Sequence, residues 1–304
     1  MKLSLLFATF NGESTLPVML DALTRVAVPA AGFEIIAVNN GSTDQTAAVL
    51  ASFTERLNIQ IINAPERGKN RALNAGLTQV TGDTVVLTDD DIIPDPDWLV
   101  KMEDCLNANP DFAVFGGRIK PHWPGELPEY IKQHVPMTMV FAITDDHQAD
   151  GPVDPQLIWG ANMAVRRMIF DKGFRFCENV GPASGNYIMG SETEFTRRLA
   201  ANGYPSYFCN APVVQHIVRA NQLTKDWLWG RSIRSGRAEC LNHLDRHRLE
   251  YKTVFGVPIW IINRCLSDYA HYLVYSLLGH GDIAFAKRFS ASRWRGYIMQ
   301  ALKS

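Results

Sequence analysis

Three successive carboxylates, Asp89, Asp90 and Asp91, are the residues most suggestive of chemistry. They follow residues 85–88, a short apolar run typical of a buried strand. Adjacent carboxylates repel one another, and a hard divalent cation, Mg²⁺ or Mn²⁺, bridged to substrate phosphates would neutralise them. Residues i and i+2 of an extended segment share a face, so Asp89 and Asp91 can point into one pocket while Asp90 points away. The alternative is a solvated acidic turn.

Two further polar turns lie earlier in the chain. In residues 39–44, Asn-Asn-Gly-Ser-Thr-Asp, Gly41 permits a tight turn and Ser42 forms a capping-box signature with Gln45. In residues 67–71, three cations surround Gly68 just before a helical pattern, which suits a clamp on a diphosphate. The simpler interpretation of residues 39–44 is an ordinary strand-to-helix turn, and that of residues 67–71 is a solvated helix start.

A pair of glutamates opens a later helical pattern. Glu192 and Glu194 stand at its start, where the helix dipole stabilises a carboxylate, and one of them could be the general base for an acceptor hydroxyl. His216 follows the apolar run 212–214 and is a candidate third metal ligand. A lone histidine on such a strand is more often a hydrogen-bonded core residue.

The elements that would position these groups alternate between strand and helix. The predicted strands are Leu3–Ala8, Glu34–Val38, Ile59–Asn63 and Thr84–Thr88, with amphipathic helical patterns between them. This order predicts a parallel sheet with right-handed crossovers and an α/β fold. Because ligands of such sheets bind at the carboxyl ends of the strands, the polar turns should share one pocket.

The second half of the chain is more irregular. We predict strands at 112–116 and 159–165, a loop at 121–136 and a helix from Glu192 to Asn202 that ends before Gly203. Beyond residue 220 the pattern is helical. The expected organisation is one α/β domain with a first half (1–100) and a second half (101–220), followed by a helical extension (221–304).

Composition narrows the class of protein. The chain has 304 residues, 46% of them hydrophobic, and a net charge of -1, which gives no bias toward nucleic acid. Five scattered cysteines without CxxC spacing favour a reducing compartment over a zinc site or a disulfide scaffold. The short N-terminal apolar run is interpreted as a strand and not as a signal peptide, and no apolar run is long enough to span a membrane.

Taken together, these segments resemble the family 2 glycosyltransferases, which have the GT-A fold. The matching motifs, in chain order, are Thr9-Phe10-Asn11, Asn39 to Asp44, Gly68-Lys69 with Asn74-Ala75-Gly76, Asp89-Asp90-Asp91 with 93–99, Gly160-Ala161-Asn162-Met163, Glu192-Thr193-Glu194, and His216. The resemblance covers residues 1 to about 220. Each motif is weak alone, but their order and spacing make the match strong.

The resemblance implies a GT-A sheet with a helical extension and a role for each matching residue. It implies Glu192 as the catalytic base, with Glu194 as the competing candidate. Donor binding would fall to Thr9, Asn11, Glu13, Asn39, Gly68, Lys69, Asn74, Asp89 and Asp90. Asp91, Asp89 and His216 would hold Mn²⁺ or Mg²⁺, and Trp159, Gly160, Ala161 and Asn162 would face the acceptor. The implied reaction moves a sugar from a nucleotide diphosphate-sugar to an acceptor hydroxyl with inversion.

Two positions depart from the family pattern. Asn39 stands where the family usually has an aspartate that accepts a bond from uracil N3–H; an Asn carbonyl still accepts such a bond, so a UDP-sugar is favoured. Ser191-Glu192 replaces the usual Glu-Asp pair, so the base would be one methylene longer. The sugar, the acceptor and the linkage are not indicated, and surface polysaccharide or glycolipid assembly is the family-level expectation.

The C-terminal region is basic and aromatic. After Asp282 come Lys287, Arg288, Arg293, Arg295 and Lys303, with no acidic residue. One interpretation is a helix on an anionic membrane surface near a lipid-linked acceptor, in a cytoplasmic protein peripheral to the inner face of the cell membrane. The others are packing on the catalytic lobe and a dimer interface; the oligomeric state is not indicated.

Two other functions compete with glycosyl transfer. A nucleotidyltransferase that makes a nucleotide-sugar usually carries a Gly-rich basic loop after its first strand, but residues 9–13 here read Thr-Phe-Asn-Gly-Glu. A non-catalytic nucleotide-sugar binder would be favoured if the metal aspartates or the helix glutamates were lost. Both sets are present, which disfavours this function.

Overall fold

The computed structural model describes residues 1–181 and 188–303, except for the side chains of residues 243–250. The chain forms two compact units. The first unit is built from Met1–His122 and most of residues 141–217, and the second from Trp123–Val140 and the residues from 218 onward.

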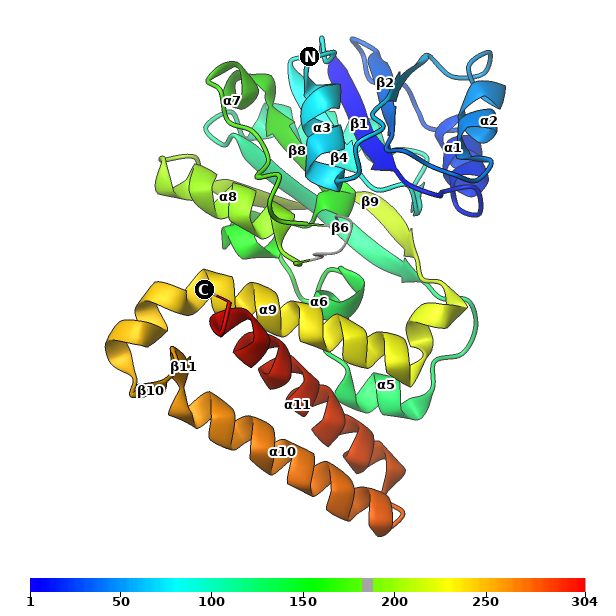
Figure 1. Ribbon diagram of the computed structural model, residues 1–304. Coiled ribbons are helices and arrows are strands. Elements are labelled where there is room, and N and C mark those ends of the chain that lie inside the picture. The colour runs from blue at the N-terminus through cyan, green and yellow to red at the C-terminus, as the bar shows by residue number, and fades with distance from the viewer. Residues whose placement is uncertain (182–187, 304) are drawn as a thin grey trace. The chain divides into compact units, whose positions relative to one another are not determined.

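A nine-stranded, mostly parallel sheet forms the centre of the first unit (Figure 1). Its strands are β1 (Leu3–Thr9), β2 (Phe33–Asn39), β3 (Ile59–Asn63), β4 (Thr84–Thr88), β5 (Ile92–Pro94), β6 (Val114–His122), β7 (Gly151–Val153), β8 (Met163–Arg166) and β9 (Ser206–Ile217). Their order is β3-β2-β1-β4-β8-β6-β9-β5, with β7 paired to β9. Strands β1 to β4 are parallel, whereas β8 runs antiparallel to β4.

The register of the parallel strands brings their carboxyl ends to one edge. Thr9 at the end of β1 lies opposite Asn39 of β2, and Asn39 lies opposite Asn63 of β3. Phe7 of β1 lies opposite Thr88, the last residue of β4. This common edge is therefore where the polar turns that follow β1, β2 and β4 meet.

Helices cover this sheet with their apolar faces. They are α1 (Leu16–Leu23), α2 (Thr46–Ser52), α3 (Lys69–Leu77), α4 (Trp98–Ala108), α7 (Arg167–Asp171) and α8 (Ser191–Ala201), with 3-10 turns η1 (Pro155–Leu157) and η2 (Gly160–Asn162). Leu73 and Leu77 of α3 and Phe195 and Leu199 of α8 enter one buried cluster with strand residues. Burial of these faces fixes the helix starts, which carry the polar residues of the site, against the sheet.

Several expected features of the first unit are different in the structure. Helix α2 begins at Thr46, and the Ser42 hydroxyl accepts a bond from the Asn11 N–H instead of capping that helix. The predicted strand 159–165 begins with the turn η2 and becomes a strand only at Met163. Cys105 of α4 and Cys209 of β9 form a disulfide, so the expectation of unpaired cysteines in a reducing compartment is wrong for this pair.

The second unit is helical. Its elements are α5 (Glu129–His134), α6 (Met137–Phe141), η3 (Ala220–Leu223), α9 (Lys225–Glu250), a small hairpin of β10 (Thr253–Val254) and β11 (Val257–Pro258), α10 (Ile259–Leu277) and α11 (Gly281–Ala301). Helix α5 replaces part of the loop predicted at 121–136. Glycines let α9 and α11 approach closely, because a side chain at Gly236 would collide with the backbone of Arg293, and one at Gly296 with that of Ile233. Within the described part of the chain, no helix combines the length and hydropathy of a membrane span.

Candidate active site

The start of α3 is held by the side chain of Asn40. Its amide oxygen accepts the N–H of Gly68 at 2.8 Å, and its amide nitrogen donates to the carbonyls of Ala64 (3.2 Å) and Glu66 (2.7 Å). Gly68 has φ +149°, a conformation that favours glycine. These bonds fix the backbone immediately before Lys69.

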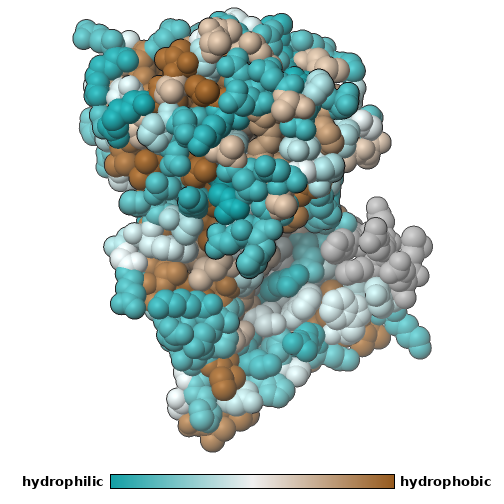
Figure 2. Space-filling model, turned by 180° about the vertical axis from the view of Figure 1, so that it is seen from behind, coloured by the Kyte–Doolittle hydropathy of each residue, from teal (hydrophilic) through white to brown (hydrophobic). Residues whose placement is uncertain are grey.

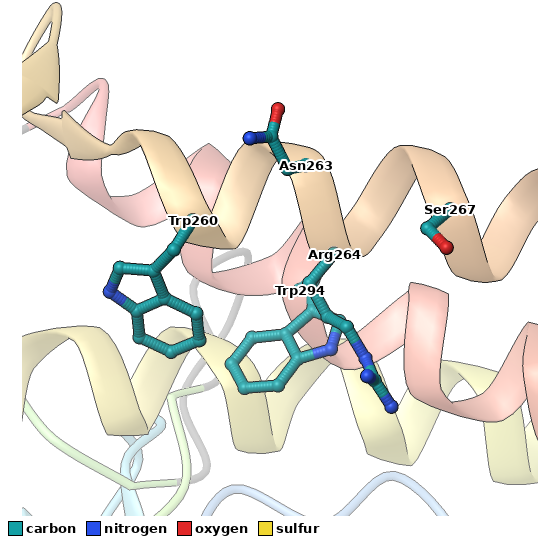
Figure 3. Close-up of a pocket in the computed structure, with 5 residues that line it drawn as sticks. All are labelled: Trp260, Asn263, Arg264, Ser267 and Trp294. Atoms are coloured by element: carbon teal, nitrogen blue, oxygen red, sulfur yellow. The ribbon is translucent and has the colours of Figure 1, made fainter.

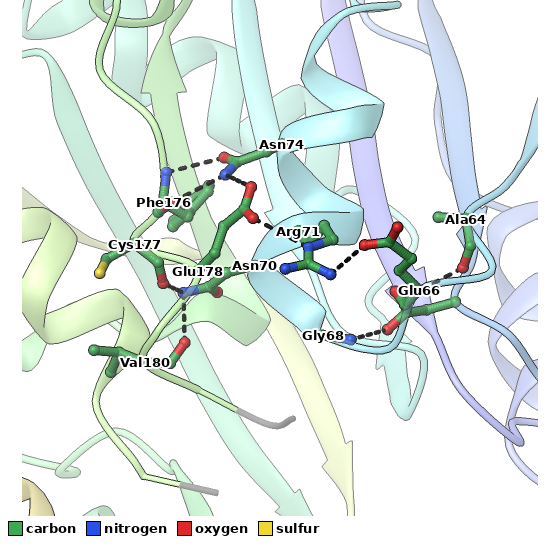
Figure 4. Close-up of polar contacts among 11 residues, drawn as sticks. Ala64, Glu66, Gly68, Asn70, Arg71, Asn74, Phe176, Cys177, Glu178 and Val180 are labelled. Carbon is green, nitrogen blue, oxygen red and sulfur yellow. Dashed lines mark hydrogen bonds and ion pairs between the residues drawn. The ribbon is translucent and has the colours of Figure 1, made fainter. Parts of the chain in front are cut away.

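The other side of α3 is attached to the segment 176–180 (Figure 4). Asn70 donates to the carbonyls of Cys177 and Val180, and Asn74 pairs with both backbone groups of Phe176. Arg71 pairs with Glu66 and Glu178. Of the three cations predicted around Gly68, Arg71 is thus used in fastening the helix, and Arg67 lies over the Phe10 ring.

Lys69 joins two carboxylates that are far apart in the sequence. Its Nζ lies 2.6 Å from Oδ1 of Asp89, after β4, and 3.1 Å from Oε1 of Glu192, in the first turn of α8. Burial disfavours the charged form of Lys69, but the two carboxylates outweigh it and hold its pKa well above the usual value. Burial likewise opposes ionisation of Glu192, and the Lys69 charge nevertheless lowers its pKa. Lys69 and Glu192 are therefore both charged at neutral pH.

Glu192 approaches closely only because residue 160 is a glycine. A Cβ at Gly160 would lie 2.5 Å from Oε1 of Glu192 and 2.8 Å from its Cγ. Glu194, two residues on, instead pairs with Arg198 at 2.7 Å. The geometry thus brings Glu192, and not Glu194, to Lys69 and Asp89.

The other two aspartates of the triplet have separate partners. Asp90 accepts a bond from the buried Thr9 hydroxyl at the end of β1, and Gly12 leaves room for this pair. Oδ1 of Asp91 lies 3.4 Å from Nε2 of His216. Asp90 and Asp91 occupy a turn between β4 and β5, so the strand alternation assumed from the sequence ends at Thr88.

Asp91 and His216 have the chemistry of a cation site. Nδ1 of His216 lies 2.6 Å from the carbonyl oxygen of Phe141 and must donate to it, which leaves Nε2 facing the carboxylate. Burial opposes a charge on His216, but Asp91 raises its pKa above the usual value. A carboxylate oxygen and an imidazole nitrogen at this spacing fit adjacent ligands of one octahedral ion, which lie about 3 Å apart. Among the residues that the structure describes, no group of three or more His, Cys, Asp or Glu is placed to hold a metal.

The turns after β1 and β2 are bonded to each other. Asn11, with φ +52°, accepts the N–H of Thr43 at 2.9 Å, and Glu13 accepts that of Gln45 at 2.9 Å. Asn39 is buried and accepts the N–H of Ser42 at 3.2 Å. These side chains border the same sheet edge as Asp89 but are used partly in shaping the two turns.

The segment 159–162 lies beside Glu192. Trp159 is half-buried, and the buried Ala161 accepts a bond from Thr88 through its carbonyl. Asn162 is fully buried: it accepts from the Trp98 indole and donates to the carbonyls of Arg118 and Pro212. Its amide ties the turn η2, which contains Gly160, to α4, β6 and β9.

Sequence reasoning assigned no role to Asn40 and Asn70, although both hold α3 in place. Asn40 was visible only as part of the 39–44 turn, and its partners lie 24 to 28 residues further along the chain. Asn70 has partners more than 100 residues away. A second asparagine in a strand-to-helix turn was the one available signal for Asn40.

Comparison with known proteins shows the family of this chain. The model of the glycosyl transferase family 2 matches residues 4–174. The glycosyltransferase AglE of Haloferax volcanii is 25% identical over 285 residues, covering 92% of this chain and 86% of that protein. The glucosyl-dolichyl phosphate glucuronosyltransferase of the same organism is 23% identical, covering 78% of this chain and 75% of that protein.

Two solved structures share the fold. The mannosyltransferase PcManGT from Pyrobaculum calidifontis, in complex with GDP-Man and Mn²⁺, has a TM-score of 0.62 at 18% identity, over 96% of this chain and 86% of that one. Staphylococcus aureus TarS 1-349, in complex with UDP-GlcNAc, has a TM-score of 0.53 at 16% identity, over 99% and 92%. The sheet with its flanking helices is therefore the GT-A fold of nucleotide-sugar-dependent transferases.

With the family model spanning more than half of its residues, the chain belongs to glycosyl transferase family 2. Membership confirms the resemblance drawn from the order of its motifs.

Proposed function

We propose that this protein is an inverting glycosyltransferase that moves a sugar from a nucleotide diphosphate-sugar, with a UDP-sugar favoured, to an acceptor hydroxyl. The observation that carries the proposal is the placement of Lys69 between Asp89 and Glu192 at the carboxyl edge of the parallel sheet. That edge is where ligands of open α/β sheets bind. In this proposal residues 1–100 bind the donor, residues 101–220 bind the acceptor, and residues 221–304 extend the domain.

Glu192 is the general base. Its carboxylate takes the proton of the acceptor hydroxyl while the hydroxyl oxygen attacks the anomeric carbon. The bond from that carbon to the diphosphate oxygen breaks, and the nucleotide diphosphate leaves with the electron pair. One displacement of this kind inverts the configuration. Glu194 is the weaker candidate because Arg198 holds it.

The partners of Lys69 change when the donor binds in this mechanism. Before the donor binds, it neutralises Asp89 and Glu192. A diphosphate attracts the ammonium group away from Glu192, and without that cation the pKa of Glu192 rises toward the range of a useful base.

Asp91 and His216 would hold Mn²⁺ or Mg²⁺, with Asp89 either joining them or binding the ribose. The ion, when bound, neutralises charge on the departing diphosphate. The 3.4 Å spacing of the two donor atoms supports this assignment. The structural neighbour with GDP-Man and Mn²⁺ makes a divalent ion reasonable for this fold.

The remaining predicted residues either bind the substrates or hold the site in shape. Asn11, Glu13 and Asn39 border the nucleotide, with the Asn39 carbonyl accepting from the base. Gly68 gives the diphosphate access to backbone N–H groups. Thr9 orients Asp90, Asn74 fastens α3, and Asn162 supports Gly160 beneath the acceptor. Trp159 and the backbone around Ala161 face the acceptor.

The acceptor belongs, in this proposal, to surface polysaccharide or glycolipid assembly, on a saccharide or a lipid-linked saccharide. The name of the glucuronosyltransferase relative, which acts on a glucosyl-dolichyl phosphate, supports the lipid-linked form. We place the enzyme in the cytoplasm, peripheral to the inner face of the membrane.

The test is donor binding followed by turnover. UDP-, dTDP- and GDP-sugars are compared by calorimetry with and without Mn²⁺, and release of nucleotide diphosphate is then followed for the donor that binds. We expect metal-dependent binding, and Asp91→Ala is expected to abolish turnover. Binding that ignores both nucleotide and metal would overturn the proposal.

A further inference from the structure

Helix α10 in the second unit presents an apolar stripe to solvent. The stripe consists of Ile259, Leu266, Tyr269, Leu273 and Leu277, all exposed, with Leu277 at 88% and Leu266 at 65%. The spacing of three, four or seven residues places them on one face of the helix. Ile261 and Asp268, on another face, are buried. Hydrophobic surface of the helical unit is visible in the space-filling view (Figure 2).

The stripe continues beyond the helix. Phe255, at the tip of the β10–β11 hairpin that precedes α10, is 84% exposed, and Val254 and Leu278 are also exposed. A helix of 19 residues is about 28 Å long. A row of exposed apolar side chains of this length indicates an interaction surface.

An aromatic pocket flanks the stripe (Figure 3). It has a volume of about 510 Å³ and is lined by Trp260, Asn263, Arg264, Ser267 and Trp294. The two indole rings lie 5.4 Å apart at 76°. Indoles with neighbouring cationic and polar groups are typical of the boundary between hydrocarbon and headgroups of a lipid layer.

The surrounding charge identifies the partner. Residues 251–304 contain seven Lys and Arg against two Asp and no Glu. One of the two, Asp268, is buried and neutralised by Arg264 (3.1 Å), Lys287 (3.6 Å) and the Ser290 hydroxyl. Arg293 pairs with Glu239, and the exposed charged residues that remain are Lys252, Arg295 and Lys303 against Asp282. The exposed charge of this region is therefore positive.

We propose that the stripe of α10 docks on an anionic phospholipid surface, with the Trp260–Trp294 pocket at headgroup depth. A second copy of this chain would bring a like positive charge against this region, whereas acidic lipids complement it. The apolar side chains enter the acyl boundary, and the cations remain among the phosphates. This inference deepens the membrane location proposed above. It rests on residues 251–304 of the second unit and does not depend on the glycosyl-transfer chemistry.

The test is co-sedimentation of the full chain with phosphatidylcholine vesicles, with and without phosphatidylglycerol. We expect binding to the anionic vesicles that weakens as NaCl is raised. The variant Leu273→Gln/Leu277→Gln should bind at least about tenfold more weakly, because two apolar side chains lose their burial. The control Leu157→Gln/Met168→Gln alters two exposed apolar side chains of the first unit and should bind like the parent.

Brominated lipids provide a second readout, since they should quench the tryptophan fluorescence of the parent, and quench a smaller fraction of it in Trp260→Phe. Equal binding to neutral and anionic vesicles, or an α10 variant that binds like the parent, would overturn the proposal. A second result would also overturn it: light scattering shows a dimer of the parent, the α10 variant is a monomer, and the parent does not bind vesicles. Donor binding measured on the same variants separates this outcome from failure of the catalytic proposal.

Discussion

The two ends of the parallel sheet in the first unit each carry a paired glutamate, and they differ in how it is held. At the amino end, Glu34 of β2 accepts bonds from the Ser4 hydroxyl (2.6 Å), the Thr81 N–H (2.7 Å) and Lys2 (3.2 Å). Burial opposes its ionisation, but these donors lower its pKa to about 2. At the carboxyl end, Glu192 depends on the long side chain of Lys69.

The difference separates a structural carboxylate from a reactive one. The donors to Glu34 include a backbone group and two short side chains, which have fewer rotatable bonds than a lysine side chain. The ammonium of Lys69 is on a flexible stem, so a competing anion can withdraw it. The same residue type thus contributes stability at one end of the sheet and is available for chemistry at the other.

The largest effect is expected from substitution of Glu192, at the carboxyl end of the sheet. Glu192→Gln keeps the shape of the side chain but removes the base, and we expect turnover to fall by about 10²–10⁴-fold while calorimetric donor binding persists. Glu194→Gln, the matched control on the same helix turn, should keep most of the activity. Equal losses in the two variants would remove the distinction between them.

A smaller loss is expected from displacing Glu192 without changing it. A methyl group in Gly160→Ala collides with the Glu192 carboxylate. We expect a fall in kcat of about 10–100-fold, in line with the cost of a small misplacement, with the melting temperature little changed. Gly125→Ala adds the same methyl group where no atom lies within 4 Å, and it should be silent. Full activity in Gly160→Ala would show that this contact does not place the base.

Substitution of Glu34, at the amino end of the sheet, should change the stability of the protein and not its activity. Because the pKa of Glu34 is lowered, its stabilisation is present above the unfolded value of 4.5 and is lost as the pH falls toward about 2. Glu34→Gln should therefore lower the free energy of unfolding by about 1–2 kcal/mol at pH 7, after allowance for solvent screening. The difference from the parent should shrink below pH 4.5, as denaturant titrations at several pH values would show. Constant destabilisation from pH 7 to pH 3 would contradict it.

Much of the donor edge could be predicted because it depends on local order. The strands Ile59–Asn63 and Thr84–Thr88 have the bounds expected from their apolar runs. Strand ends converge in a parallel sheet, so the meeting of Thr9, Asn39 and Asp89 near one edge followed from topology. The proposed roles of these residues await the measurements above.

What could not be predicted depends on long-range packing. Nothing near Trp159 in the sequence indicates a 3-10 turn, which arises as Asn162 bonds to Trp98, Arg118 and Pro212. The Cys105–Cys209 pair joins residues 104 positions apart. Ser42 matched a helix cap in pattern, but the neighbouring turn at Asn11 offered it another partner.

The side chain of Asn40 ties the position of Lys69 to the end of β2. Three bonds from one amide tie the last turn before α3 to the end of that strand. Length changes between α2 and β3, at residues 53–58, occur at the opposite end of the sheet and leave this tie intact. Insertions or deletions in that loop should therefore leave the lysine in register with its two carboxylates.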